Sequence, residues 1–218
     1  MYGKNGVRMS DFAPLPDAPL KMAVLISGRG SNMEALLQAC QNADFPAETV
    51  LVLSNRPAAG GLEKASSFGI RTAVVDHKEY DDKASFEAAM QDELERAGVN
   101  VICPAGFMRL LSAEFVEKWP NRILNIHPSL LPKYKGLDTH ERALAAGDKE
   151  AGCTVHFVRP AMDSGPIILQ RTVPVLDGDD PDRLAARVLK EEHAIYPEAV
   201  KLLGEGRLKI VDDRVEIL

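Results

Sequence analysis

Short apolar runs and amphipathic stretches alternate along most of this chain. The apolar runs have the length of buried strands and lie at residues 22–26, 50–53, 72–75, 99–103, 123–127, 153–158 and 167–173. Helical spacing of apolar residues is found at residues 61–68, 83–97 and 112–119, and from residues 31, 138 and 181 onward. Two last runs, 208–211 and 214–217, predict a β-hairpin. The alternation favours an α/β fold with a mostly parallel central sheet and helices on both faces.

Two of the predicted helices begin with the signature of a capping box, in which a polar side chain caps the helix and a glutamate three residues later reaches back. These pairs are Ser31 with Glu34 and Asp138 with Glu141. The long helix that begins at residue 181 contains Pro197. Because proline lacks an amide hydrogen and its ring clashes with the preceding turn, we expect Pro197 to kink or divide that helix.

The composition is ordinary for a globular protein, with 45% hydrophobic and 27% charged residues among 218. Residues 1–20 hold few large apolar groups, so we predict either a disordered arm or residues left from cloning there, followed by a single domain over 21–218. The formal net charge of −6 provides no basic field that would attract nucleic acid or anionic lipid. Small-molecule substrates are therefore favoured.

The three cysteines, Cys40, Cys103 and Cys153, are far apart and form no C-x-x-C pair. They predict neither a disulfide framework nor a zinc site, and they suit a reducing compartment. No apolar run approaches the roughly 20 residues of a membrane helix, and residues 1–20 lack the apolar centre of a signal peptide. We therefore expect a cytoplasmic protein.

The strand predicted at 123–127 carries two polar residues, Asn125 and His127, where the other residues are apolar. Side chains alternate along a strand, so these two point to the same side, and Pro128 ends the strand just after them. Open α/β sheets build their ligand sites at such carboxyl ends. The pair is either an amide and an imidazole placed for developing negative charge, or a buried polar pair satisfied by backbone groups.

A glycine-containing loop joins the first strand to the first helix, with the sequence Ser27-Gly28-Arg29-Gly30-Ser31-Asn32. Free amides at a helix start, together with the helix dipole, can bind an anion, and the two glycines allow a phosphate to come close. The loop is neither a dinucleotide fingerprint nor a P-loop, because Met33 stands at the third glycine and no Gly-Lys-Ser/Thr follows. The alternative is a tight turn without a ligand.

Three further features are candidates for a site. The apolar loop after the strand at 99–103, residues 104–111, can either read the edge of a flat heterocycle through its backbone or be merely structural. His156 shares a strand face with Thr154 and is expected to support the reacting groups from behind. Asp163 lies in an Asp-Ser-Gly turn, where it can pair with an imidazolium or simply make the turn.

Five segments, taken in order, resemble the phosphoribosylglycinamide formyltransferases, which are folate-dependent enzymes of purine synthesis. They are Ile26-Ser27-Gly28-x-Gly30-Ser31-Asn32, Ala105-Gly106-Phe107-Met108-Arg109, Asn125-Ile126-His127-Pro128-Ser129-Leu130-Leu131-Pro132, Asp163-x-Gly165-Pro166 and Glu192-His193-Ala194-Ile195-Tyr196-Pro197. The resemblance extends from about Met22 to Leu208. The glycine loop and the last segment point to this family, whereas the other motifs are shared with further formyl-folate enzymes. The implied fold is a Rossmann-like three-layer sandwich with a C-terminal β-hairpin.

The resemblance implies a formyl transfer from the co-substrate 10-formyltetrahydrofolate to the primary amine of glycinamide ribonucleotide, with no metal. The implied phosphate and ribose site consists of Gly30, Ser31, Asn32, Met33, Glu34 and Glu192. The implied folate site consists of Lys83, Met108, Arg109, Leu110, Leu111, Asn125, Arg159, Pro160, Ala161 and Met162. Lys83 stands where the family can carry an arginine, and a lysine lacks the bidentate fork for a carboxylate of the folate tail.

The implied catalytic residues are Asn125, His127 and Asp163. Attack by an amine on a formyl carbon creates an oxyanion, and fixed donors aimed at that oxygen provide the largest rate gain. We expect Asn125 and protonated His127 to be those donors. We expect Asp163 to pair with the imidazolium and to assist the proton transfer, either directly or through water.

Three other functions are compatible with parts of this pattern. Hydrolysis of formyltetrahydrofolate uses a similar set, but that family usually has an N-terminal regulatory domain, which we do not expect in residues 1–20. Formylation of initiator methionyl-tRNA would require a basic C-terminal domain, whereas we expect this chain to end after one hairpin. A non-catalytic phosphate-binding module would leave the Asn-His-Asp set without a reason. We expect small-molecule partners, no nucleic acid or membrane, and a monomer or homodimer.

Overall fold

The computed structural model describes residues 19–218. The strands are β1 (Leu20–Ile26), β2 (Ala47–Ser54), β3 (Thr72–Val74), β4 (Val101–Pro104), β5 (Leu124–His127), β6 (Glu150–Phe157), β7 (Ile167–Pro174), β8 (Leu208–Val211) and β9 (Arg214–Ile217). The helices are α1 (Ser31–Ala39), α2 (Gly61–Ser67), α3 (Lys83–Arg96), α4 (Ala113–Glu117), α5 (Thr139–Ala145) and α6 (Pro181–Gly204), with a 3₁₀ turn at His77–Glu79. Every strand and helix expected from the hydrophobic pattern is confirmed, and only the 3₁₀ turn is additional.

The sheet changes from parallel to antiparallel along its width. Four strands pair in parallel in the order β3-β2-β1-β4, and three pair antiparallel in the order β5-β6-β7. A single parallel bridge between Ile102 and Ile123 joins the two parts. The predicted α/β class is confirmed, and the predicted hairpin is β8–β9.

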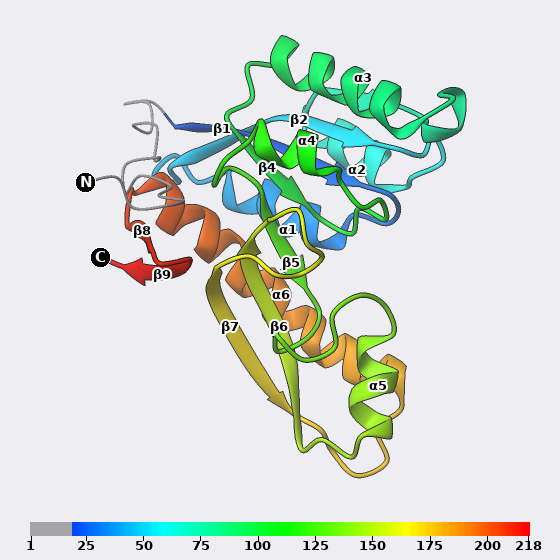
Figure 1. Cartoon of the computed structure of the whole chain (residues 1–218), viewed down its shortest axis with the longest axis vertical. Helices are drawn as coiled ribbons and strands as arrows, with labels where there is room; N and C mark the ends of the chain where they lie inside the picture. Colours follow the sequence, from blue (N-terminus) through cyan, green and yellow to red (C-terminus); the bar gives the residue numbers. More distant parts are fainter. Residues whose placement is uncertain (1–18) are drawn as a thin grey trace, which may run out of the picture.

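The strand β1 has an apolar core on each of its faces, which explains why it reads as an unbroken apolar run. Met22, Val24 and Ile26 pack with α1 and α6 in one cluster. Ala23 and Leu25 pack with α3 and α4 in the other. Figure 1 shows α3 and α4 over one face of the sheet and α1 and α6 over the opposite face. The fold is therefore a sandwich of three layers.

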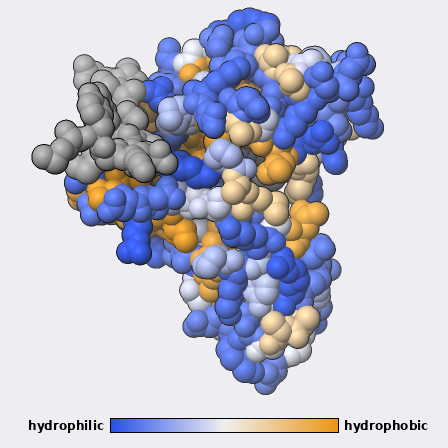
Figure 2. Space-filling view, viewed as in Figure 1, coloured by the Kyte–Doolittle hydropathy of each residue, from blue (hydrophilic) through white to orange (hydrophobic). Residues whose placement is uncertain are grey.

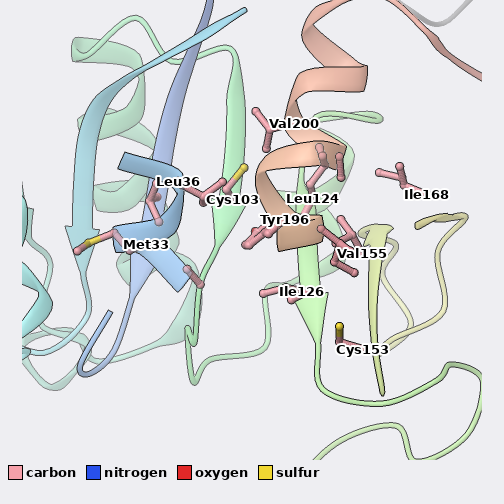
Figure 3. Packing of buried hydrophobic residues seen from close by; sticks show 14 of the residues in the cluster. Met33, Leu36, Cys103, Leu124, Ile126, Cys153, Val155, Ile168, Tyr196 and Val200 are labelled. Atoms are coloured by element: carbon pink, nitrogen blue, oxygen red, sulfur yellow. The ribbon is translucent and has the colours of Figure 1, made fainter. Parts of the chain in front are cut away.

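The helix α6 packs across the change in sheet direction. Its Tyr196 and Val200 belong to the same buried cluster as Leu124 of β5 and Val155 of β6, part of which Figure 3 shows. The Tyr196 hydroxyl donates to the backbone carbonyls of Pro104, at 2.8 Å, and Leu124, at 2.7 Å. Burial raises the pKa of Tyr196 well above its usual value, so the hydroxyl keeps its proton and remains a donor. Tyr196 thus ties the last parallel strand to the first antiparallel one.

Two local predictions about helices are wrong, and a third, that Pro197 kinks or divides α6, is wrong as to the division. The cap of α1 is Gly30 in a left-handed conformation, and no side chain caps the helix, so Ser31 and Glu34 form no capping box. Asp138 does cap α5, but at φ 57° its side chain accepts no capping hydrogen bond. The helix α6 continues through Pro197 to Gly204, so the proline does not divide it.

The prediction of a disordered arm falls on residues 1–20, of which 1–18 lie outside the described residues. The prediction of a single domain over 21–218 stays a prediction. Among the described residues, no helix combines the length and the apolar character that a membrane span requires.

We predict that Tyr196→Phe destabilises the protein by about 1–3 kcal/mol, because two buried carbonyls lose their hydroxyl donor while the ring is kept. Urea unfolding followed by circular dichroism measures the change. The matched control is Tyr80→Phe, at a half-buried tyrosine that packs against Phe86, where a change within about 0.5 kcal/mol is expected. Equal stabilities of Tyr196→Phe and the unchanged protein would contradict the bridging role.

Candidate active site

The candidate site lies where neighbouring strands end. β1 pairs in parallel with β4, and β4 is bridged in parallel to the chain entering β5, so their carboxyl ends meet at one edge of the sheet. The glycine loop follows β1, the apolar loop follows β4, and His127 ends β5. The sheet topology therefore brings together three stretches that the sequence singled out separately.

Asn125 is oriented by a neighbouring histidine. The antiparallel register places Asn125 opposite His156, and the Asn125 Nδ2 lies 3.3 Å from His156 Nε2. His156 Nδ1 donates to the carbonyl of Phe157 at 2.9 Å, which leaves Nε2 free to accept from the amide. Burial lowers the pKa of His156, against smaller opposing effects from that carbonyl and from Asp163, so the ring is neutral at pH 7. One amide hydrogen of Asn125 is thereby used and the amide group is fixed.

The imidazole of His127 is held between a backbone carbonyl and a carboxylate. Its Nε2 donates to the carbonyl of Tyr134 at 2.9 Å. This contact turns Nδ1 toward Asp163, whose Oδ2 lies 3.5 Å away. The other carboxylate oxygen, Oδ1, is 3.9 Å from Nε2 of His156. The structure thus brings Asn125, His127 and Asp163 together, with the Asp163 carboxylate directly beside the imidazole of His127.

Asp163 reaches this place through an unusual backbone conformation. Its φ of 47° lies in the left-handed region, which non-glycine residues seldom adopt and aspartate tolerates better than most. The Gly136 amide donates to its Oδ2 at 2.9 Å, and its side chain is 13% exposed. The Asp-Ser-Gly turn therefore directs a mostly buried carboxylate toward His127 at the end of β5.

The glycine loop has the geometry of an anion site. The first intrahelical hydrogen bond of α1 runs from the Glu34 amide to the Gly30 carbonyl, so the amides of the preceding turn precede the hydrogen-bonding ladder. Gly30 has φ 69°, and a side chain there would lie 3.1 Å from the Cα of Gly61. The Gly61 amide in turn donates to the carbonyl of Gly28 at 3.0 Å. The glycine loop thus packs against the start of α2 at Gly61. Because these contacts are made by glycines, they join backbone to backbone at the start of α1.

A buried carboxylate adjoins this helix start. Asn32 Nδ2 donates to Glu192 Oε2 at 2.6 Å, although the two residues are 160 positions apart. Burial raises the pKa of Glu192, and the Asn32 hydrogen bond opposes that effect. The Oδ1 of Asn32 is buried without a hydrogen-bond partner among the described residues. The candidate anion site, a buried carboxylate and an acceptor without a partner among the described residues therefore lie side by side.

Several of the apolar residues predicted for the folate are exposed. Met108 and Leu110 are each 60% exposed and Met162 is 50% exposed, whereas Leu111 is buried. Figure 2 shows a mostly hydrophilic surface on which apolar residues gather around the middle of the molecule. Exposed methionine and leucine side chains offer a flat ring an apolar surface.

Two of the three charged residues predicted for the folate, Arg159 and Lys83, have carboxylates nearby. Arg159 pairs with Asp213 at 3.2 Å. Lys83 lies 3.9 Å from Glu87, which accepts from the backbone amide of Ser112 at 2.7 Å. Lys83 therefore lies close to the end of the apolar loop, because its ammonium and the Ser112 amide both face the carboxylate of Glu87.

Sequence reasoning missed several contacts in this region. The Ser27 hydroxyl donates to Asn55 Oδ1 at 2.5 Å and accepts from the Met108 amide at 2.8 Å, which links the glycine loop to the apolar loop. The carbonyl of Tyr134 and the amide of Gly136 were missed as well, because backbone groups leave no signal in residue type. The role of Ser27 could have been predicted, because Ser27 is the first residue of the glycine loop. Among residues 19–218, no group of three or more His, Cys, Asp or Glu side chains is placed to hold a metal ion.

The sequence matches the model of the formyl transferase family over residues 20–200. The phosphoribosylglycinamide formyltransferase of Escherichia coli (strain K12) is 44% identical over 191 residues, which are 88% of this chain and 90% of that protein. The trifunctional purine biosynthetic protein adenosine-3 of Bos taurus is 45% identical over 95% of this chain, which spans 20% of that relative's length.

Solved structures agree with the sequence relatives. A glycinamide ribonucleotide transformylase 1 from Symbiobacterium toebii is similar with a TM-score of 0.90 and 48% identity, over 92% of this chain and 94% of that one. A formyltetrahydrofolate deformylase from Burkholderia mallei is similar with a TM-score of 0.84 and 30% identity, over 92% of this chain and 70% of that one.

We predict that Nε2 is protonated in one histidine of the site and bare in the other. At pH 7.5, His156 carries its proton on Nδ1, because Nε2 accepts from Asn125, whereas His127 carries a proton on Nε2, which donates to Tyr134. Nitrogen-15 NMR of the imidazole rings distinguishes a protonated from a bare nitrogen, with His156→Gln used for assignment. A protonated Nε2 on His156 would contradict the arrangement.

The lowered pKa of His156 also predicts a direction for stability against pH. The unfolded chain takes up this proton near pH 6.5, whereas the folded chain does so only at lower pH. The unfolded state therefore binds more protons in that interval, and stability decreases as the pH falls below about 6.5. His156→Gln is expected to flatten this part of the curve of unfolding free energy against pH.

Proposed function

Since this chain belongs to the formyl transferase family, we propose that it transfers a formyl group from 10-formyltetrahydrofolate to the amine of 5'-phosphoribosylglycinamide in purine biosynthesis. The observation that carries the proposal is the grouping of Asn125, His127 and Asp163 at the end of β5, with the glycine loop on the same sheet edge. The E. coli relative bears the name of this activity and is matched over nearly its whole length.

The phosphate of the ribonucleotide is assigned to the start of α1. Its oxygens would accept from the amides of Gly30, Ser31 and Asn32, and the dipole of α1 favours the charge there, with Met33 and Glu34 completing the turn. Glu192 would receive the ribose hydroxyls or the ammonium from the far side of Asn32. The folate would lie on the apolar surface of residues 108–111 and on the loop 159–162, with Lys83 toward its tail.

The chemical step uses the groups at the end of β5. The amine nitrogen of the ribonucleotide attacks the formyl carbon, and the carbonyl electron pair moves to the oxygen to give a tetrahedral intermediate. The amide of Asn125 and the Nδ1–H of the protonated imidazole of His127 would donate to that oxyanion, because Nε2 of His127 is held by the Tyr134 carbonyl. Because both side chains are held by hydrogen bonds beforehand, little reorganisation is needed when the charge develops.

Collapse of the intermediate completes the transfer. The carbonyl forms again, the bond from the formyl carbon to the folate nitrogen breaks, and the proton lost by the attacking amine ends on that nitrogen. The carboxylate of Asp163, 3.5 Å from His127 Nδ1, would balance the imidazolium and assist this proton transfer, either directly or through water. The co-substrate is thus a folate, and the chemistry assigned to these residues involves no metal.

A hydrolase is the second candidate, since a deformylase is among the structurally similar proteins. The same three residues would then activate the formyl group toward water. We further propose small-molecule partners only, a cytoplasmic location, and a monomer or homodimer. The location rests on the three unpaired cysteines, Cys40, Cys103 and Cys153.

The test of the function is the release of free folate from 10-formyltetrahydrofolate with and without glycinamide ribonucleotide. Release that depends on the ribonucleotide is expected for the transferase. Equal release without the ribonucleotide would establish the hydrolase, and no release under either condition would favour a binding protein without catalysis.

We predict that His127→Ala and Asp163→Asn each lower turnover by about 100-fold or more and leave the binding of the ribonucleotide largely intact. These changes remove a donor to the oxyanion or the charge beside it, while the phosphate seat is kept. Steady-state kinetics and calorimetric titration separate the two effects. Asp177→Asn, at an exposed position between β7 and α6, is the control. Near-normal turnover of either variant would remove that residue from the catalytic set.

A further inference from the structure

Both members of the His127–Asp163 pair are held by one short backbone segment, residues 133–137, between β5 and α5. The carbonyl of Tyr134 accepts from His127 Nε2 at 2.9 Å. Two residues later, the amide of Gly136 donates to Asp163 Oδ2 at 2.9 Å. The relative position of imidazole and carboxylate therefore depends on where this segment lies.

The segment has a conformation that needs support from outside. Tyr134 has φ 54°, in the left-handed region where a side chain other than glycine is strained. Such a backbone persists only when surrounding contacts hold it. The contacts available to Tyr134 are those of its own side chain and of the residues next to it.

Asp148 supplies one anchor for this segment. It lies in the connection between α5 and β6. The Tyr134 hydroxyl donates to Asp148 Oδ2 at 2.9 Å, and Lys133 Nζ lies 3.0 Å from the same oxygen. The hydrogen bonds from Lys133 and Tyr134 lower the pKa of Asp148, and the bond to Asp148 raises the pKa of Tyr134. At neutral pH, Asp148 is therefore an ionised acceptor and Tyr134 a protonated donor.

Arg142 of α5 supplies a second anchor for the same segment. Its guanidinium lies 5.1 Å from the centre of the Tyr134 ring. It also donates to the carbonyls of Lys135, at 2.7 Å, and Leu137, at 3.3 Å. The ring of Tyr134 is thus fixed by a cation over its face and by a carboxylate at its hydroxyl.

We propose that Asp148 is a positioning residue for His127, acting through the side chain and then the carbonyl of Tyr134. Without Asp148, the Tyr134 side chain loses its hydroxyl anchor, the strained backbone relaxes, and the carbonyl no longer holds the imidazole against Asp163. The kinetic part of this proposal rests on the proposed formyl transfer. Small displacements of a reacting group are costly, because catalysis depends on the orientation of the group.

The kinetic test compares Asp148→Ala, which removes the acceptor, Tyr134→Phe, which removes the donor, and the double variant in ribonucleotide-dependent folate release. Each single variant is expected to lower kcat by about tenfold and to change KM for the ribonucleotide by less than about twofold. The double variant should be no slower than the slower single variant, because both changes break one hydrogen bond. Asp177→Asn is the control, with kcat within about twofold of the unchanged protein.

A spectroscopic readout in the free protein tests the positioning without any reaction. The Nε2 proton of His127 should exchange slowly with water in the unchanged protein and at least about tenfold faster in both single variants, because its acceptor has moved. Tyr134→Phe keeps the ring under Arg142, so this variant still tests the proposal if Asp148→Ala does not fold. Urea unfolding checks each variant.

The outcomes are distinct. A lower kcat together with faster exchange supports the proposal. A kcat within about twofold of the unchanged protein in a folded Tyr134→Phe, or an unaltered exchange rate, overturns it. If the unchanged protein releases no folate with the ribonucleotide, the proposed function fails, and the exchange rate alone then decides the positioning role.

Discussion

A buried imidazole needs partners for both ring nitrogens, and at His127 this requirement organises the surroundings of the site. The residue is 6% exposed, so water cannot supply those partners freely. One nitrogen is satisfied by the Tyr134 carbonyl and the other faces the Asp163 carboxylate. The two residues that supply these partners, Tyr134 and Asp163, both have a left-handed backbone conformation. The backbone is therefore strained in both loops that contact this side chain. The contacts that satisfy the imidazole are therefore the same contacts that form the proposed catalytic pair.

The change from parallel to antiparallel pairing decides where this event takes place. Parallel strands place the glycine loop, the apolar loop and the end of β5 on one edge of the sheet. The antiparallel neighbour β6 places His156 opposite Asn125. The loop between β6 and β7 carries Asp163, which lies beside His127. Tyr196 fastens the two parts at their junction through two carbonyls. The residues proposed to anchor the ribonucleotide phosphate thus follow the parallel half of the sheet, and the residues proposed to carry the catalysis belong to the antiparallel half.

Direct contacts connect the regions assigned to the two substrates. Ser27 joins the glycine loop to the Met108 amide, and Asn32 joins the helix start to Glu192 on α6. The site is therefore a network that spans several elements, and its members support one another. In such a network, loss of one member leaves a buried polar partner unsatisfied.

The sequence alone determined the elements, their order and the chemical types at the strand end, because apolar periodicity reflects burial and a polar pair in an apolar strand is conspicuous. Local signals were wrong where the backbone was left-handed: at Gly30 and Asp138, the helices begin without the predicted side-chain caps. Only the tertiary structure decided that Asp163 meets His127 directly and that Tyr134 and Gly136 hold the pair. The physical reason is that these contacts use backbone groups and distant partners, whose positions depend on packing rather than on residue type.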